Sequence, residues 1–156
     1  LFLIGSVLFL GFSFNLLIIA RNYDLYRIIY LLLLSTMTDT FALITGKLVG
    51  KHKLVPKISP NKTIEGLLGG VIMGTFIASS FYHVFINPTI SLVMVILITT
   101  ALSIVGQIGD LVFSMIKRYY NKKDFSNLIP GHGGILDRFD SIIFIALAFI
   151  LVADIL

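Results

Sequence analysis

Residues 89–109 read TISLVMVILITTALSIVGQIG, a run without a single charged side chain. A bilayer core about 30 Å thick needs roughly 20 apolar residues of helix to cross it. The run therefore predicts a membrane-spanning helix, which we extend to Ser114. The whole composition agrees, because 57% of the 156 residues are apolar, only 13% are charged and the mean hydropathy is +1.00. These values exclude a soluble globular domain and a disordered chain, and the absence of cysteine excludes a disulfide scaffold or cysteine chemistry.

Four more apolar stretches are long enough for the same interpretation. They cover residues 1–20, 28–46, 64–86 and 135–156. We therefore predict an all-α, polytopic membrane helix bundle with about five transmembrane helices, forming one integral membrane domain over residues 1–156. The stretch 64–86 carries Gly66, Gly69, Gly70 and Gly74, a spacing that favours close packing between helices.

Basic residues are concentrated in two of the connecting segments. Segment 47–63 has five lysines and segment 117–134 has four Lys or Arg, together nine of the twelve basic residues in the chain. Short cytoplasmic loops of membrane proteins collect Lys and Arg. Both segments are therefore predicted to be cytoplasmic loops, which strict alternation of five spans allows. Any chemistry on a soluble substrate is expected on that face.

Four acidic residues lie inside or at the ends of predicted spans, where an ionised carboxylate is costly. They are Asp39, Asp110, Asp137 and Asp140. Helical spacing places Asp110 on one stripe with Gln107, Ser114 and Lys117, and it places Asp137 and Asp140 on a shared face. Oxygen ligands of this kind suit Mg²⁺ better than zinc. Each acid taken alone is equally consistent with a helix-end carboxylate paired to a nearby Lys or Arg, but the four together favour a site for a metal and a polyphosphate.

Two further segments are candidates for binding phosphate. The stretch Pro130-Gly-His-Gly-Gly134 precedes a predicted helix, where backbone N–H groups can cradle an anion; a flexible turn is the alternative. The lysines of segment 47–63 can neutralise phosphates or lie against anionic lipid. Within that segment, Ser59 or Thr63 is predicted to cap the following helix, with Glu65 in its first turn.

Read together, these pieces resemble the phosphatidate cytidylyltransferases, also called CDP-diacylglycerol synthases. The resemblance is carried by Ser114-Met-Ile-Lys-Arg118, Lys123-Asp124, Pro130-Gly-His-Gly-Gly134 and Asp137-Arg-Phe-Asp140, and upstream by the stretch from Gly50 to Gly66 and by Asp39-Thr-Phe-Ala-Leu43. It implies an enzyme that transfers the cytidylyl group of CTP to phosphatidic acid with Mg²⁺, giving CDP-diacylglycerol and pyrophosphate. A bacterial inner or plasma membrane location is expected, with the active site facing the cytoplasm and no role for nucleic acid.

The resemblance also implies roles for individual residues. Asp110 and Asp137 would be the metal ligands, and Asp140 would support the metal or its water shell. Phosphates and headgroups would be held by Ser59, Lys62, Thr63, Ser114, Lys117, Arg118, Lys123, His132, Gly133, Gly134 and Arg138. Because relatives have additional N-terminal helices, the chain is expected to be the C-terminal part of a longer enzyme. The resemblance and the glycine-rich stretch 64–86 together suggest a homodimer.

Two alternative functions remain at this point. A CTP-dependent enzyme acting on another lipid, such as a CDP-archaeol synthase or a polyprenol kinase, would have the same architecture. An ion-coupled transporter would explain buried acids along an ion path. It gives no reason for a His-Gly-Gly segment beside nine basic residues.

Overall fold

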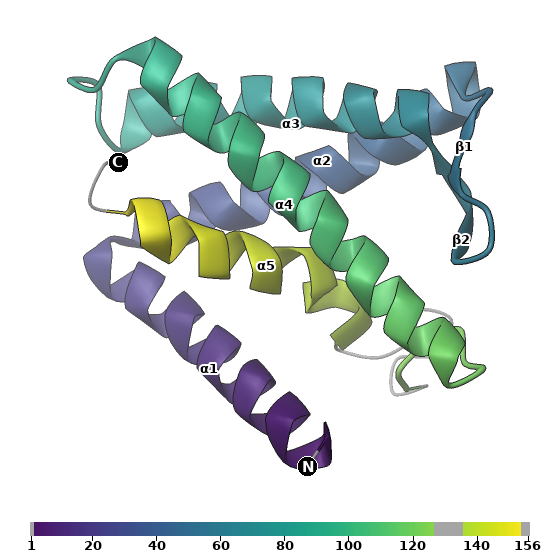
Figure 1. Cartoon of the computed structure of the whole chain (residues 1–156). Coiled ribbons are helices and arrows are strands. Elements are labelled where there is room, and N and C mark those ends of the chain that lie inside the picture. The colour runs from purple at the N-terminus through teal and green to yellow at the C-terminus, as the bar shows by residue number, and fades with distance from the viewer. Residues whose placement is uncertain (1, 127–135, 154–156) are drawn as a thin grey trace.

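The structure is a computed structural model that describes residues 2–126 and 136–153, without the side chains of residues 2–8, 10, 23 and 138. Its described part consists of five helices and one two-stranded hairpin (Figure 1). In chain order these are α1 (Phe2–Tyr23), α2 (Leu25–Val49), β1 (Lys53–Val55), β2 (Ser59–Thr63), α3 (Ile64–Phe85), α4 (Leu92–Tyr119) and α5 (Leu136–Val152). The predicted all-α membrane bundle of about five helices is confirmed.

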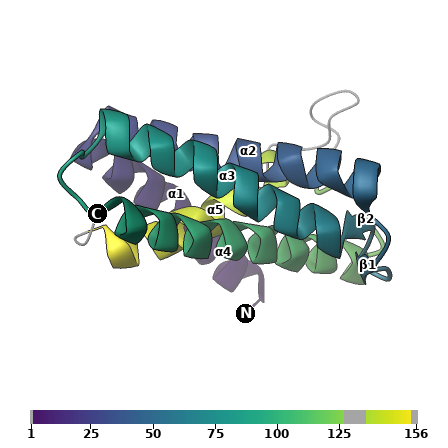
Figure 2. The same cartoon turned by 90° about the horizontal axis from the view of Figure 1, so that it is seen from above.

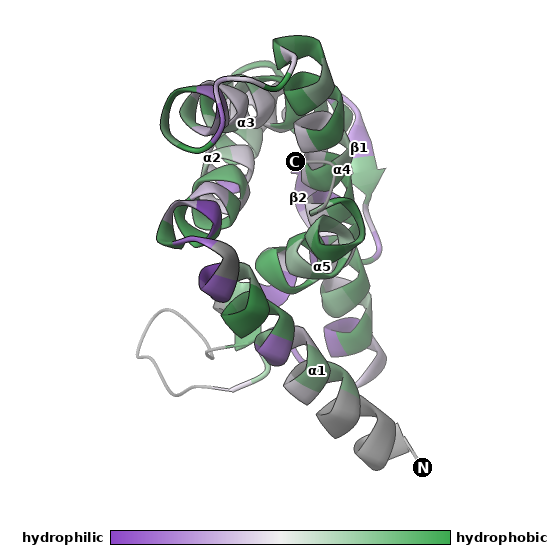
Figure 3. Cartoon of the chain, turned by 90° about the vertical axis from the view of Figure 1, so that its left-hand side faces the viewer, coloured by the Kyte–Doolittle hydropathy of each residue, from purple (hydrophilic) through white to green (hydrophobic). Residues whose placement is uncertain are grey.

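The helices have the length and composition that a bilayer requires. By these criteria α2, α3 and α4 are each long and apolar enough to span a membrane, and α5 contains the shorter apolar stretch Phe139–Val152. Large apolar side chains such as Phe76, Val93 and Leu97 are exposed on the outside of the bundle. Figure 3 shows that hydrophobic residues predominate along the helices. In water such a surface would aggregate, whereas lipid solvates it. The chain is therefore an integral membrane protein.

Helices α2 and α3 lie side by side because glycines let their backbones approach (Figure 2). A Cβ atom built on Gly70 would lie 2.5 Å from the carbonyl oxygen of Thr38, and one built on Gly66 would lie 2.6 Å from that of Ala42. Neither distance is tolerated by real Cβ atoms. The close packing predicted for the glycine-rich stretch is confirmed, and its partner is α2 of the same chain.

The centre of the bundle combines aromatic packing with paired hydroxyl groups. Tyr30, Tyr82 and Phe149 are fully buried, and the Tyr30 ring meets the Tyr82 ring edge to face at a centroid distance of 5.2 Å. The Tyr30 hydroxyl lies 2.9 Å from the Thr99 hydroxyl. Polar groups at this depth need a partner within the protein. The core therefore ties α2 to α3, α4 and α5.

The bounds predicted for the two basic segments need correction. Lys47 lies in the last turn of α2, and Lys117 and Arg118 lie in the last turn of α4. Helix α4 continues past the apolar run because no proline or glycine follows Gly109 before its end. The chain leaves the helical path at Asn121, which adopts a left-handed backbone conformation with φ 54°. The long stems of Lys and Arg let such residues remain helical while their charges leave the apolar layer.

The segment between α2 and α3 contains a hairpin that the sequence did not predict. Strands β1 and β2 pair antiparallel, with Lys53 opposite Thr63 and Val55 opposite Ser59. The strands are short and contain Pro60, so their pattern resembles that of a loop. As predicted, Thr63 caps α3, because its hydroxyl accepts a hydrogen bond of 3.0 Å from the Gly66 N–H. The cap fixes the direction in which β2 enters the helix.

Candidate active site

A polar cavity of about 450 Å³ lies where the hairpin meets α2, α3, α4 and α5. All four acids that the sequence singled out line it, and they come from three different helices. The cavity is lined by Asp39, Ala42, Leu43, Leu54, Ser59, Asn61, Lys62, Thr63, Gly66, Leu67, Gln107, Asp110, Lys117, Asp124, Asp137 and Asp140. Five carboxylates and two ammonium groups therefore surround one space.

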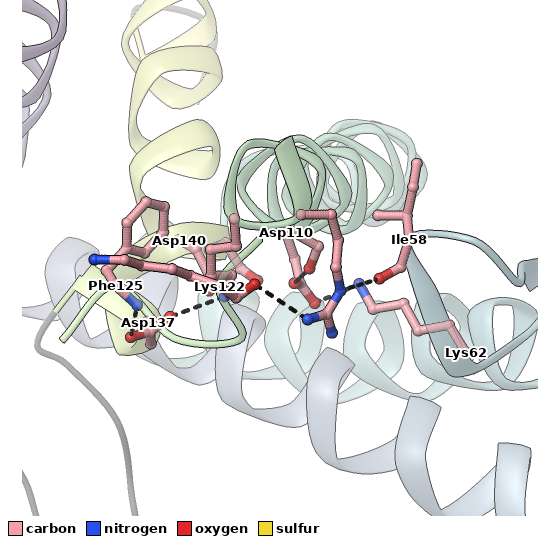
Figure 4. Close-up of polar contacts among 11 residues, drawn as sticks. Ile58, Lys62, Asp110, Lys122, Phe125, Asp137 and Asp140 are labelled. Atoms are coloured by element: carbon pink, nitrogen blue, oxygen red, sulfur yellow. Dashed lines mark hydrogen bonds and ion pairs between the residues drawn. The ribbon is translucent and has the colours of Figure 1, made fainter. Parts of the chain in front are cut away.

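Asp110 on α4 is paired with a lysine from the hairpin. The Lys62 ammonium donates to Oδ2 of Asp110, and the Ser114 hydroxyl, one turn further along α4, donates to Oδ1 at 3.3 Å. Both Lys62 and Asp110 are partly shielded from solvent. Of the predicted stripe on α4, Gln107, Asp110 and Lys117 line the cavity, and Ser114 joins it through its hydrogen bond to Asp110. Asp110 is the member that meets the hairpin residue Lys62 (Figure 4).

Lys117 is placed between the two carboxylates at the start of α5. Its Nζ atom lies 2.8 Å from Oδ1 of Asp137 and 3.9 Å from Oδ2 of Asp140. The three side chains are only 11%, 7% and 12% exposed. Asp137 also accepts a 3.0 Å hydrogen bond from the Phe125 N–H. Since the two carboxylates share one helix face, a cation between them offsets their repulsion.

Asp39 reaches the same cavity from α2. The Ser141 hydroxyl donates to its Oδ2 at 3.4 Å, and the Ser141 N–H donates to Oδ1 of Asp140 at 2.9 Å. Ser141 therefore connects a carboxylate of α2 with one of α5. The sequence could not assign Asp39 a partner, because the residue that bridges it lies about a hundred positions away.

The hairpin forms one wall of the cavity and is held by hydrogen bonds at two places. Near its base, the Glu65 carboxylate accepts hydrogen bonds from the Lys51 N–H at 3.1 Å and the His52 N–H at 3.2 Å, and lies 2.7 Å from the His52 ring. At its turn, Nε of Arg118 donates to the Ile58 carbonyl oxygen at 3.0 Å. The sequence assigned no role to His52, and the contact with Glu65 becomes visible only in the folded hairpin.

Several predicted site residues lie elsewhere. Arg118 contacts the backbone carbonyls of Ile58 and Lys122 and does not line the cavity, and Lys123 is exposed outside it. Ser114 reaches the site only through Asp110. Asp124 and Gln107 line the cavity although the sequence proposed neither as a ligand. His132, Gly133, Gly134 and the side chain of Arg138 lie outside the described residues.

The donor set fits a hard divalent cation that is completed by a substrate. Within residues 2–126 and 136–153, no group of three or more His, Asp or Glu side chains is arranged to hold a metal ion by itself. Mg²⁺ is usually bound through one or two carboxylates, with phosphates and water filling its other positions. The position between Asp137 and Asp140 already holds a positive charge, the ammonium of Lys117. The chemistry of the site thus matches a cation whose remaining coordination positions are filled by water and by an anionic ligand.

A second cavity, of about 650 Å³, adjoins the polar one and is mainly apolar. Its walls include Phe113, Phe125 and Phe144. Lys117 and Asp124 line both cavities. The site therefore offers charged and apolar surfaces side by side, as an amphiphilic ligand requires.

Fold and site together define a polytopic helical membrane protein with a cavity lined by charged side chains at one end of the bundle. The chain belongs to the cytidylyltransferase family, whose model matches residues 1–156. This confirms the resemblance seen in the motifs between Asp39 and Asp140.

Curated relatives agree with the family. The chain is 45% identical over 144 residues to the phosphatidate cytidylyltransferase of Staphylococcus saprophyticus, covering 92% of this chain and 55% of the relative. It is 46% identical over 144 residues to that of Staphylococcus haemolyticus, with the same coverage. It is 44% identical over 147 residues to that of Bacillus subtilis, covering 92% of this chain and 54% of the relative. The chain thus spans about half the length of the curated relatives it matches.

Proposed function

We propose that this chain carries the catalytic cavity of an enzyme that transfers the cytidylyl group of CTP to phosphatidic acid, giving CDP-diacylglycerol and pyrophosphate. One observation supports this most: the acids of three helices and two lysines face one cavity, which adjoins an apolar cavity through Lys117. Family membership and the names of the relatives point to the same reaction.

The reaction explains why the cavity needs both signs of charge. A phosphatidate oxygen attacks the α-phosphorus of CTP, the new P–O bond forms, and the bond to pyrophosphate breaks. Both reactants are anions, so their repulsion must be screened by cations at fixed positions. The attacking oxygen is already ionised, and therefore no Ser or Cys nucleophile and no strong general base is required.

Seven residues that line the cavity have a proposed part in this reaction. Asp110 and Asp137 would hold Mg²⁺, with Asp140 supporting its water shell. When bound, Mg²⁺ neutralises charge on the phosphates and helps the leaving group depart. Lys62 and Lys117 would bind phosphate oxygens, and Ser59 and Thr63 would contact the nucleotide or the lipid headgroup from the hairpin. Lys123, Arg118, Arg138 and the segment His132-Gly133-Gly134 remain predicted phosphate contacts.

The surroundings of the site suit a lipid acceptor and a soluble donor. The apolar cavity would take the part of phosphatidic acid next to its headgroup, and Lys117 at the shared wall would face the phosphate. Most basic residues of the chain belong to the segments that meet at this end of the bundle. By the positive-inside rule this end would face the cytoplasm of a bacterial cell, where CTP is available.

A homodimer has weaker support than the sequence suggested. The glycine-rich face of α3, which favoured it, packs against α2 of the same chain. The dimer therefore rests on the family resemblance alone.

Membrane vesicles containing the full-length protein provide the test. With labelled CTP and phosphatidic acid, we expect CDP-diacylglycerol only when Mg²⁺ is present. Asp110→Asn and Asp137→Asn should abolish the product while insertion persists. Asp24→Asn, which changes an acid at the start of α2 outside the cavity, is the matched control and should retain activity. Full activity of either cavity variant would refute the metal assignment.

The same vesicles distinguish the remaining alternatives. Turnover with an archaeal ether lipid or a polyprenol, and none with phosphatidic acid, would assign a different lipid acceptor. Ion flux without consumption of CTP would reject the enzyme in favour of a transporter.

A further inference from the structure

The carboxylates proposed to hold the metal are the same ones that the two cavity lysines neutralise. Lys62 is paired with Asp110, and Lys117 lies between Asp137 and Asp140. The lysines reach these acids from two different elements, Lys62 from β2 and Lys117 from α4. Asp110, Asp137 and Asp140 thus each lie near a lysine ammonium group in the structure.

A divalent cation and an ammonium group compete for such positions. Lys117 donates to Oδ1 of Asp137 at 2.8 Å, and the other oxygen, Oδ2, accepts from the Phe125 N–H, so both oxygens that a metal could bind already have a donor. Two positive charges on one carboxylate repel each other strongly in a site that is largely shielded from water. Binding of the metal therefore favours departure of the ammonium.

The lysines can leave the acids without leaving the cavity. Each has a flexible four-carbon stem and three rotatable donors, in contrast to the planar fork of arginine. Both side chains line the polar cavity, where Asn61, Ser59 and Thr63 offer further polar surface. A freed ammonium therefore remains within the space that a triphosphate would occupy.

We infer that Lys62 and Lys117 are exchangeable counterions: a divalent cation displaces their ammonium groups from Asp110, Asp137 and Asp140, and the freed ammonium groups then bind phosphate oxygens of the nucleotide. The inference rests on the proposed function. It adds that the cation prepares the phosphate site as well as binding phosphate itself. Since coupling between two ligands is reciprocal, CTP and the cation each tighten the binding of the other.

The chemical reactivity of the lysine amines tests the displacement of Lys62 and Lys117 in the protein without any substitution. The full-length protein in lipid nanodiscs is treated with a trace amount of an acylating reagent, and modification at each lysine is measured by mass spectrometry. Adding Mn²⁺ alone should raise the acylation rate of Lys62 and Lys117 at least about threefold, because an amine released from its ion pair with a carboxylate is more accessible to the reagent. Adding CTP should then lower it again. Lys47 and Lys53, both exposed, serve as internal controls and should not respond.

Binding of Mn²⁺ is followed by electron paramagnetic resonance in the same samples. Lys117→Met and Lys62→Met should each bind Mn²⁺ at least about tenfold more tightly without CTP, because the competing charge is gone. Lys47→Met, which removes an exposed charge from the same face, should bind it as the unmodified protein does. If Lys117→Met fails to fold, Lys62→Met still tests the exchange. The Lys62–Asp110 pair is less buried, so its loss should destabilise the protein less.

The outcomes separate this inference from the proposed reaction. Bound Mn²⁺ without a change in acylation of Lys62 and Lys117 would overturn the exchange, and so would an absence of Mn²⁺ binding. If turnover of CTP and phosphatidic acid persists in that case, the proposed function still stands. A lysine response to Mn²⁺ in a protein that does not make CDP-diacylglycerol would support the exchange and reject the reaction.

Discussion

Nζ of Lys117, in the last turn of α4, lies 2.8 Å from Oδ1 of Asp137, in the first turn of α5. The pair joins two helices at the end of the bundle where their apolar surfaces give way to the cavity. It also brings the polar stripe of α4 into contact with the Asp-Arg-x-Asp segment, although residues 118–136 separate the two motifs in the sequence. One contact thus serves both the packing of the bundle and the assembly of the site.

Removing the ammonium of this pair should destabilise the protein. Lys117→Met leaves two buried carboxylates without their cation, and breaking a buried pair in this way costs about 3–5 kcal/mol. We expect a lower free energy of unfolding in detergent, and a larger recovery on adding Mn²⁺ than in the unmodified protein. Lys47→Met is the control and should change little. Unchanged stability of Lys117→Met would mean that the pair contributes nothing to the fold.

Arg118 is expected to act mainly by positioning the hairpin. Arg118→Lys keeps the charge but loses the fork that joins the carbonyls of Ile58 and Lys122. Amide hydrogen exchange of residues 53–63 should therefore accelerate, and kcat should fall about tenfold if the displaced hairpin costs about 1.4 kcal/mol in the transition state. If the variant instead raises KM for CTP and leaves exchange of the hairpin unchanged, Arg118 is a phosphate ligand, as the family resemblance implied.

Close approach of α2 and α3 should not tolerate a side chain at Gly70. Gly70→Val would place methyl groups against the Thr38 carbonyl oxygen and force the helices apart. Overpacking of this kind costs about 1–3 kcal/mol or more, and it would also shift Asp39, one residue beyond Thr38. A loss of both thermal stability and activity is expected. Gly11→Val is the matched control, because a Cβ atom at Gly11 meets nothing within 4 Å; equal behaviour of the two variants would contradict the packing argument.

The buried hydroxyl pair of Tyr30 and Thr99 should contribute a small, measurable coupling. Thr99 donates to the Val95 carbonyl oxygen at 2.7 Å, so the Tyr30 hydroxyl is the donor in the 2.9 Å contact. Hydrogen bonds between membrane helices contribute about 0.6 kcal/mol on average in double-mutant cycles. A cycle of Tyr30→Phe and Thr99→Val should give a coupling of about that size. Strict additivity of the two changes would show that the hydroxyls do not interact.

The sequence by itself determined the helices and most of the ingredients of the site. Apolar runs long enough to cross a bilayer predict spans whatever their neighbours are, because lipid demands internally satisfied helices. The predicted spans 28–46 and 64–86 correspond closely to α2 and α3. The cost of a charge inside a span marked Asp39, Asp110 and Asp140 as exceptional before any contact was known. The family resemblance was also visible in the sequence, because the motifs that support it are short and local.

Only the tertiary structure decided how those residues meet. The pairing of Lys62 with Asp110 spans 48 positions, and the bridge from Ser141 to Asp39 spans 102. Local periodicity carries no information on such separations. The β1–β2 hairpin could not be predicted from the sequence either, because its short strands are stabilised by contacts with Glu65 and Arg118, which belong to two different helices. Arg118 shows the difference most clearly. The family resemblance implied a phosphate contact for it, and the fold adds hydrogen bonds from its guanidinium to the backbone carbonyls of Ile58 and Lys122, which hold the turn of the hairpin.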